Sequence, residues 1–324
     1  MLAAADRVGS SAGTRGRAAE GWGEVASKLG ASLNVLDFGQ RSTFDPQQVE
    51  DALRKDADRR IKAVLAVQVD TSTSVLNDIG LLRQALDNAQ HPALLMADNM
   101  ASMGCEKFHM DELGVDITTA GSQKGLMTPP GVGFVWVNER AKEAQRTAKC
   151  VTHYWDWGPR LDPEAYYQNF CGTAPTHHLF GLREALNMIA EEGLPNVWER
   201  HEKLSHAIWA AVDCWAKRGA MELNVADPEV RSHAVTSIRL GGQDGARLRK
   251  WTEQVAGVTL GIGLGMESEE DPKGEGFFRI GHMGHVNAHM VLGVLSTIEA
   301  GLTALQIPHG DGALDAAAAV IAKG

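Results

Sequence analysis

Residues 61–69 read Ile61-Lys-Ala-Val-Leu-Ala-Val-Gln-Val69, a mostly apolar run that stops at the polar cluster Asp70-Thr-Ser-Thr-Ser74. An apolar run of this length, bounded by turn-forming residues, predicts a buried β-strand. Ile79, Leu82 and Leu86 then recur at helical spacing, which predicts a helix over about 77–89. A strand followed by a helix is the beginning of a β-α-β unit, so this stretch predicts a parallel sheet.

The same alternation continues along the chain. Further strands are expected at 93–97, 115–119, 133–137, 234–239 and 276–280. Further helices are expected at about 139–147, 176–192, 197–218, 245–255, 288–304 and 313–322. We therefore predict an α/β fold with a mostly parallel sheet and helices on both faces. The break at Gly193-Leu-Pro195 divides a large domain, 1–194, from a smaller α+β domain, 195–324.

The composition excludes several classes of protein. The 324 residues are 44% hydrophobic and 22% charged, which is too apolar for a disordered protein and too varied for a fibrous one. A net charge of −10 argues against a nucleic-acid partner. No apolar run reaches the roughly 20 residues of a membrane span. The four cysteines form no Cys-x-x-Cys pair, so a cytoplasmic location is expected rather than a disulfide scaffold.

Polar side chains follow three of the predicted strands at the point where each strand ends. They are Asp70-Thr71, Asp98 and Gln123-Lys124. Turns are polar in general, so any one of these groups could be a solvated loop residue. Ligands of open α/β sheets bind outside the carboxyl ends of the strands, however, so three such groups together predict a binding site.

Lys124 and Asp98 suggest what the site could bind. A lysine that loses solvation has a lowered pKa and can form a Schiff base with an aldehyde. A carboxylate can keep a pyridine nitrogen protonated, and pyridoxal phosphate needs both groups. The spacing alone leaves this open, because an aspartate followed by a lysine is a common arrangement.

Longer motifs around these residues resemble a known family. Ala93-Leu-Leu-Met-Ala-Asp98 and Gly121-Ser-Gln-Lys-Gly-Leu-Met-Thr-Pro-Pro-Gly131 resemble the core of the class V aminotransferases, which have fold type I of pyridoxal-phosphate-dependent transferases. Within that class the chain is most similar to the serine–glyoxylate and alanine–glyoxylate aminotransferases. The motifs that point to the serine–glyoxylate branch are Phe278-Arg-Ile-Gly-His282, His153-Tyr-Trp-Asp-Trp157 and Ile307-Pro-His309. The resemblance runs from about Trp22 to the C-terminus.

The resemblance implies a role for individual residues. Lys124 would hold the aldehyde of pyridoxal 5'-phosphate and move the substrate proton, and Asp98 would pair with the pyridine nitrogen. Gln123 and Thr71 would contact the cofactor. Thr173 would reach across a homodimer interface to the phosphate of the partner's cofactor. Arg279 would bind the substrate carboxylate, for which a bidentate guanidinium is suited.

The activity implied by the resemblance is transamination. A small amino acid, serine or alanine, would give its amino group to glyoxylate, yielding glycine and a 2-oxo acid. The expected partners are therefore these small molecules and a second copy of the chain, with no nucleic acid and no membrane.

The chain also departs from the family pattern. Family members carry several tens of additional residues in front, including a Ser-Gly-Thr-Gly type loop that cradles the phosphate. Gly9-Ser-Ser-Ala-Gly-Thr14 has a similar composition but lies too close to Trp22 to be that loop, and the usual ring-stacking aromatic falls near Ala18. An alternative hypothesis is therefore a truncated homologue with weak or no activity, acting only as a dimeric binding or structural protein.

Two further alternatives concern other chemistry. His282, His285 and His289 provide three imidazoles in eight residues, which suggests a metal-dependent enzyme as a remote alternative. Cysteine desulfurases share the aspartate and lysine, but they need a reactive cysteine on a late loop. The last cysteine, Cys214, falls inside a predicted helix, which argues against that activity.

Overall fold

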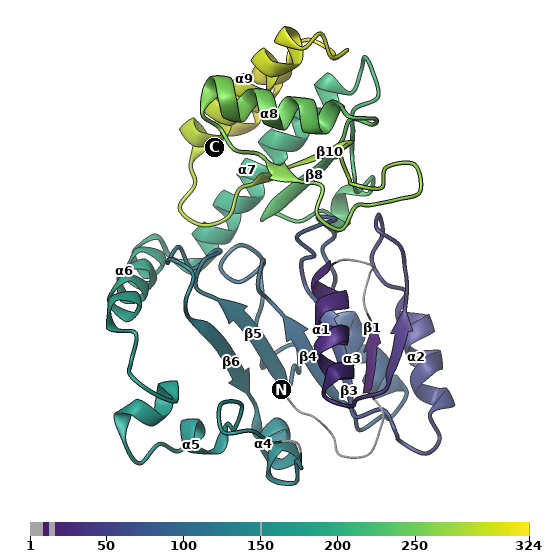
Figure 1. Ribbon diagram of the computed structural model, residues 1–324, viewed down its shortest axis with the longest axis vertical. Helices are drawn as coiled ribbons and strands as arrows, with labels where there is room; N and C mark the ends of the chain where they lie inside the picture. The colour runs from purple at the N-terminus through teal and green to yellow at the C-terminus, as the bar shows by residue number, and fades with distance from the viewer. Residues whose placement is uncertain (1–8, 13–16, 150, 324) are drawn as a thin grey trace.

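The computed structural model describes residues 9–12, 17–149 and 151–323, which form two parts, each with its own sheet (Figure 1). The end of Gly9-Ser-Ser-Ala-Gly-Thr14 and the side chain of Ala18 lie outside the described residues.

Within these residues, six strands form a sheet in the order β2-β1-β3-β4-β5-β6. The first five run parallel to their neighbours, and β6 pairs antiparallel with β5. The strands are β1 (Gly9–Ala12), β2 (Leu33–Leu36), β3 (Ala63–Val67), β4 (Leu94–Asp98), β5 (Ile117–Gly121) and β6 (Gly133–Val137). Every residue of the central β4 is buried, as expected of a parallel strand covered on both faces.

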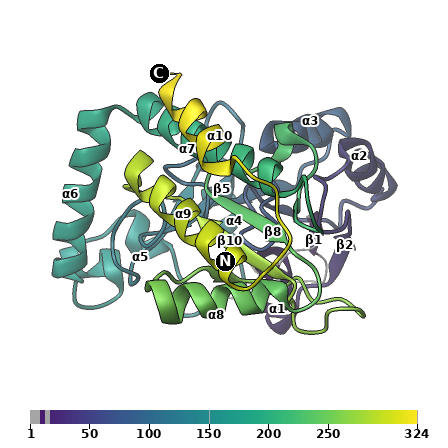
Figure 2. The ribbon, with the colours of Figure 1, turned by 90° about the horizontal axis from the view of Figure 1, so that it is seen from above.

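Helices cover both faces of this sheet. On one face, Leu53 and Leu86 pack with Leu95 of β4, and on the other Ala141 and Trp157 pack with Met96. The helices of this part are α1 (Arg17–Lys28), α2 (Pro46–Lys55), α3 (Ile79–Asn88), α4 (Glu139–Arg146), α5 (Gly158–Leu161) and α6 (Thr176–Glu192), with the 3₁₀ turn η1 (Tyr166–Phe170). The α6 helix lies at the edge of the molecule in both ribbon views (Figures 1 and 2).

The second part is an antiparallel sheet covered by helices, with strand order β7-β8-β10-β9. Its strands are β7 (Glu222–Leu223), β8 (Val235–Arg239), β9 (Gly261–Ile262) and β10 (Phe277–Gly281). Its helices are α7 (Leu194–Trp215), α8 (Asp244–Ala256), α9 (Ala288–Ala304) and α10 (Ala313–Ala322), with the 3₁₀ turn η2 (Pro228–Val230). Figure 2 shows α8 and α9 side by side over this sheet. Trp215, Leu248, Phe278 and Leu295 form the centre of its core.

The predicted α/β architecture is confirmed, and the differences are local. The strand expected at 61–69 is shorter, because β3 ends at Val67 and the next residues form the turn around Asp70. The strands β1, β2, β7 and β9 have only two to four residues each and were not predicted from the sequence. Their pairing with neighbouring strands, rather than an apolar pattern of their own, makes them strands.

Hydrogen bonds that are partly or fully buried join the two parts of the molecule. Asn224 donates from Nδ2 to the carbonyls of Gln40, at 2.8 Å, and Thr73, at 2.9 Å. Glu106, in the loop after β4, lies 2.8 Å through Oε2 from Nδ1 of His233, which precedes β8. We propose a division into a large domain, 1–194, and a small domain, 195–324, because the two sheets lie on either side of that boundary.

None of the helices in the described residues is long and apolar enough to cross a membrane.

Candidate active site

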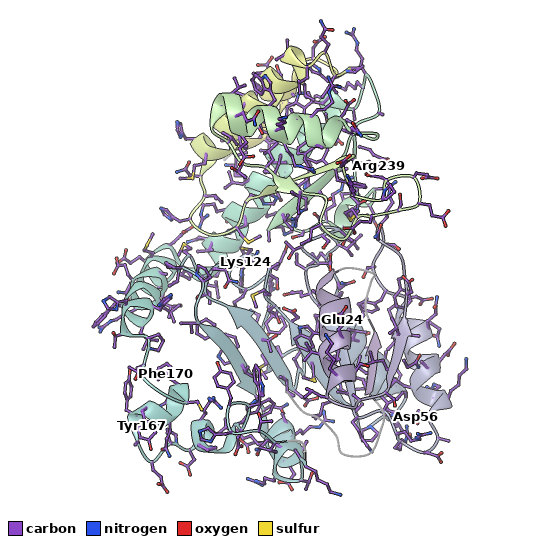
Figure 3. All side chains as sticks on the ribbon, in the orientation of Figure 1. Glu24, Asp56, Lys124, Tyr167, Phe170 and Arg239 are labelled. Carbon is purple, nitrogen blue, oxygen red and sulfur yellow. The ribbon has the colours of Figure 1, made fainter. Side chains whose placement is uncertain are left out.

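Lys124 lies in the loop after β5, at the end of the strand that faces the four-stranded sheet (Figure 3). The loop closes on Ser122. The backbone N–H of Ser122 donates to the carbonyl of Val132, at 3.0 Å, and its hydroxyl donates to that of Pro129, at 2.8 Å. The carbonyl of Ser122 accepts from the N–H of Thr128, at 2.9 Å. This closed loop holds the lysine backbone in one place.

Asp98 is the last residue of β4 and is 5% exposed. Its Oδ1 accepts from the N–H of Met100 at 2.7 Å, and its carboxylate also accepts from the side chain of Trp22 in α1. Burial raises the pKa of Asp98 to about 6, and the nearby charge of Asp70 also raises it. A buried carboxyl with few partners is suited to a cationic N–H.

Backbone packing brings the loops that carry these two residues together. The strands β4 and β5 are neighbours, with Asp98 paired to Thr119. Gly125 lies directly after Lys124, and a β-carbon added to it would stand 2.1 Å from the carbonyl oxygen of Met103 in the loop after Asp98. Only a residue without a side chain fits this contact.

Arg279 reaches the same region from β10 of the other sheet. Its Nη1 donates to the carbonyl of Thr71 at 2.6 Å, and its Nε donates to the carbonyl of Ile262 at 2.7 Å. Thr71 is half-buried in the turn after β3. The guanidinium is therefore fixed by one carbonyl from each of the two parts of the molecule, and its Nη2 makes no hydrogen bond within the described residues.

Electrostatic effects couple these side chains. Burial lowers the pKa of Lys124, which is half-buried, and the positive charge of Arg279 lowers it further. Burial also lowers the pKa of Arg279, and the negative charge of Asp70 opposes that effect. A lowered pKa gives Lys124 a larger neutral fraction, which a nucleophile or base requires.

The other two predicted residues are exposed. Gln123 projects near Gly121, since a β-carbon on that glycine would lie 2.6 Å from the Gln123 Oε1. Thr173 lies between η1 and α6, and no hydrogen bond joins it to the other predicted site residues in the described part of the chain. Figure 3 shows the neighbouring Phe170 well away from Lys124. Thus Thr71, Asp98, Lys124 and Arg279 lie around one region, and Thr173 does not.

The structure adds two residues to which the sequence gave no individual role. Asp70 is fully buried and interacts electrostatically with both Arg279 and Asp98. It lies in the turn after β3, and the pattern of polar strand ends identifies its position but not its role. The side chain of Trp22, in α1, donates a hydrogen bond to Asp98, and no local sequence pattern indicates that contact.

The histidine hypothesis finds little support in the geometry. His282 is buried, with Nε2 at 2.9 Å from the hydroxyl of Thr236 and Nδ1 at 2.9 Å from the carbonyl of His233. Both ring nitrogens are therefore engaged within the protein. His285 and His289 are exposed, and the part of the chain that the structure describes contains no group of three residues that could hold a metal ion.

The donor set fits pyridoxal phosphate. Asp98 supplies a buried carboxylate for the ring N–H, and Lys124 supplies a partly desolvated amine for the aldehyde. Asp70 Oδ2 is buried and has no hydrogen-bond partner among the described residues. The region therefore contains a hydrogen-bond acceptor that the chain does not itself satisfy.

Comparison with known proteins places the chain in a family. Residues 16–266 match the family described as Aminotransferase class-V. The chain is 36% identical over 289 residues to serine–glyoxylate aminotransferase of Methylorubrum extorquens, covering 87% of this chain and 69% of that protein. It is 33% identical over 289 residues to L-aspartate–glyoxylate aminotransferase of Paracoccus denitrificans, covering 89% and 70%.

A solved structure agrees with these matches. The ureidoglycine–glyoxylate aminotransferase of Bacillus subtilis superposes with a TM-score of 0.85 at 26% identity, covering 98% of this chain and 80% of that one. The fold is that of the fold type I pyridoxal-phosphate-dependent aminotransferases, as the resemblance implied. The chain belongs to the class V aminotransferase family and is an aminotransferase.

Proposed function

We propose that this aminotransferase uses pyridoxal 5'-phosphate to transfer the amino group of a small amino acid, serine or alanine, to glyoxylate. The observation that carries the proposal is the guanidinium of Arg279, fixed by two backbone carbonyls close enough to Lys124 to lower its pKa. A carboxylate bound there would lie beside the amine. Relatives that are named as glyoxylate aminotransferases support the choice of acceptor.

Each residue has a task in this proposal. Pyridoxal phosphate, when bound, supplies an aldehyde and an electron-withdrawing ring that stabilises negative charge at the substrate α-carbon. Asp98 would hold a proton on the ring nitrogen, and Lys124 would move a proton to and from the α-carbon. Arg279 would bind the carboxylate that every donor and acceptor carries. Thr71 and Gln123 would contact the cofactor.

A homodimer is part of the proposal. Large apolar side chains are exposed along one side of the large domain, on β6, between residues 154 and 167, and on α6: Trp136, Tyr154, Trp155, Tyr166, Tyr167, Phe180 and Leu186. Two of them, Trp136 and Leu186, also line an apolar cavity of about 250 Å³, together with Phe134, Leu182 and Trp198. Exposed apolar area of this kind indicates a protein interface.

Thr173 belongs to the same side of the chain. It is exposed, between the exposed aromatic residues of η1 and the start of α6. A residue placed there could contact a cofactor in a second copy while making no contact with its own site. We therefore propose that Thr173 helps to hold the phosphate of the partner's cofactor.

The test is an absorption spectrum of the purified chain with pyridoxal phosphate. We expect a visible band from the lysine-bound cofactor, bleached by serine or alanine and restored by glyoxylate. Aspartate serves as the competing donor, and donor rates are compared at equal concentration. A chain that takes up no cofactor, or a band that no amino acid bleaches, would contradict transamination.

The dimer is tested separately by light scattering. We expect twice the mass of 34.9 kDa. Phe180→Glu, which places a charge on the exposed apolar side, should shift the mass toward the monomer. Val255→Glu, an equally exposed apolar position on α8 of the other domain, is the control. A wild-type monomer would argue against the role of Thr173.

A further inference from the structure

Asp70 is a buried carboxylate to which the resemblance assigns no role. It follows β3, and its side chain is fully shielded from solvent. A buried carboxylate is costly unless hydrogen bonds or a cation compensate for its lost hydration. Its two oxygens have different surroundings, which indicates two tasks.

One oxygen organises the turn that follows β3. Oδ1 accepts from the N–H groups of Ser72 and Thr73, both at 2.9 Å, and from the Thr73 hydroxyl at 3.2 Å. The carbonyl of Asp70 accepts from the N–H of Ser74 at 2.8 Å. These bonds set the direction of the turn, and Thr71 lies inside it. The Thr71 carbonyl is thereby presented to the guanidinium of Arg279.

The other oxygen faces no protein donor. Oδ2 is buried, and no hydrogen-bond partner for it exists in the described part of the chain. Burial has the largest effect on the pKa of Asp70 and raises it, and the positive charge of Arg279 opposes that effect. Ser237, which is paired with Arg279 across β8 and β10, also has a buried hydroxyl without a partner among the described residues. The guanidinium therefore has polar neighbours that the folded chain leaves unsatisfied.

We propose that Asp70 is a positioning residue for Arg279, which it serves both by shaping the turn that presents the Thr71 carbonyl and by supplying a buried counter-charge. This inference rests on the proposed role of Arg279 in binding substrate carboxylates. An aminotransferase must bind and release two different carboxylates at one site in each cycle. A negative charge beside the guanidinium competes with the substrate carboxylate and thereby limits how tightly each of them is held.

The two tasks can be separated by two substitutions. Asp70→Asn keeps an oxygen that can accept the turn hydrogen bonds but removes the charge. Asp70→Ala removes both the oxygen and the charge. A purely structural role predicts that Asp70→Asn behaves like the wild type. The counter-charge predicts that Asp70→Asn binds carboxylates more tightly than the wild type, while loss of the turn makes Asp70→Ala bind them more weakly.

The experiment is calorimetric titration of the full chain, loaded with pyridoxal phosphate, with glyoxylate at pH 8. Glyoxylate is an acceptor and cannot react with the aldehyde form, so the heat reports binding alone. We expect Kd to fall about three- to tenfold in Asp70→Asn and to rise at least about tenfold in Asp70→Ala. Asp78→Asn, at an exposed carboxylate that caps α3 in the same β3–α3 connection, also removes one charge and should leave Kd unchanged.

The outcomes distinguish this inference from the function on which it rests. An unchanged Kd in Asp70→Asn overturns the counter-charge, and an unchanged Kd in Asp70→Ala overturns the positioning of Arg279. Arg279→Gln should abolish glyoxylate binding, and if it does not, the proposed substrate role of Arg279 fails instead. If the wild type takes up no cofactor, the proposed function fails, and titration of the cofactor-free chain still measures both variants.

Discussion

The α-carbon of Gly125 lies so close to the backbone of Met103 that an added β-carbon would stand 2.1 Å from the Met103 carbonyl oxygen. This contact joins two loops, one carrying Lys124 and the other following Asp98. This backbone contact involves no hydrogen bond and no charged group. The relative position of the amine and the carboxylate therefore depends on a glycine that takes no part in chemistry.

Gly125→Ala should consequently separate the two loops. Because the contact is with backbone, the structure cannot relieve it by rotating a side chain, and we expect a loss of about 1–3 kcal/mol in the free energy of unfolding. Cofactor affinity should fall with it. Thermal unfolding and titration with pyridoxal phosphate measure the two effects. Gly133→Ala in β6, where a β-carbon would meet nothing within 4 Å, is the matched control and should change neither quantity.

Arg279→Lys should weaken substrate binding without removing the cofactor. A lysine keeps the positive charge but cannot donate in the fixed geometry that the carbonyls of Thr71 and Ile262 impose on the guanidinium. We expect KM for the amino donor to rise about ten- to a hundredfold. Arg239→Lys is the control, since Arg239 lies on the neighbouring β8 but is exposed (Figure 3). Equal KM values for the two variants would contradict the role of Arg279.

Lys124→Ala should abolish covalent attachment of the cofactor. Lys124 is the lysine at the end of β5 whose pKa is lowered by burial and by Arg279. After borohydride reduction of the protein loaded with pyridoxal phosphate, we expect the reduced cofactor to remain as a label on the wild-type peptide that contains Lys124. We expect no labelled peptide in the variant. Lys142→Ala, at a surface lysine paired with Glu139 in α4, should keep the label. A label on any other lysine would refute the assignment.

The sequence predicted the elements whose own residues determine them. The apolar run of β4 and the helical spacing of α3 are local properties, and so both were located within about two residues. The polar strand ends predicted that Asp98 and Lys124 lie at one edge of the sheet, as the neighbouring parallel strands β4 and β5 place them. The resemblance then assigned Lys124, Asp98 and Arg279, of which Arg279 lies in a different sheet and could not be joined to the others by local patterns.

The features that could not be predicted from the sequence depend on contacts between distant segments of the chain. Trp22 bonds Asp98, and Asp70 interacts with Arg279, more than 200 residues away in the chain. Neither pairing leaves a periodic signal. The short strands β7 and β9 likewise exist because they pair with β8 and β10. Tertiary pairing decided these features, as it does wherever local preference is weak.

In the absence of cofactor, the buried carboxylate of Asp98 reduces the free energy of unfolding by an amount that depends on pH. Burial raises its pKa from 3.8 to about 6, so the folded chain binds this proton more tightly than the unfolded chain does. The cost of holding the charged form is absent below pH 3.8, grows as the pH rises, and is complete above about pH 6. It then amounts to about 3 kcal/mol. The cofactor's ring N–H would offset this cost.

Asp98→Asn should therefore stabilise the cofactor-free chain while weakening its binding of pyridoxal phosphate. We expect the free energy of unfolding to increase by about 3 kcal/mol at pH 8 and by about half as much at pH 5, because less of the wild-type carboxyl is charged there. Thermal unfolding at the two pH values measures the difference. Asp116→Asn is the contrasting variant, since Asp116 is equally buried but lies 3.1 Å from Arg140, so its loss should destabilise the chain. If Asp98→Asn destabilised the cofactor-free chain at pH 8 as Asp116→Asn does, the carboxylate of Asp98 would already be satisfied within the protein and would not be held for a cationic ring.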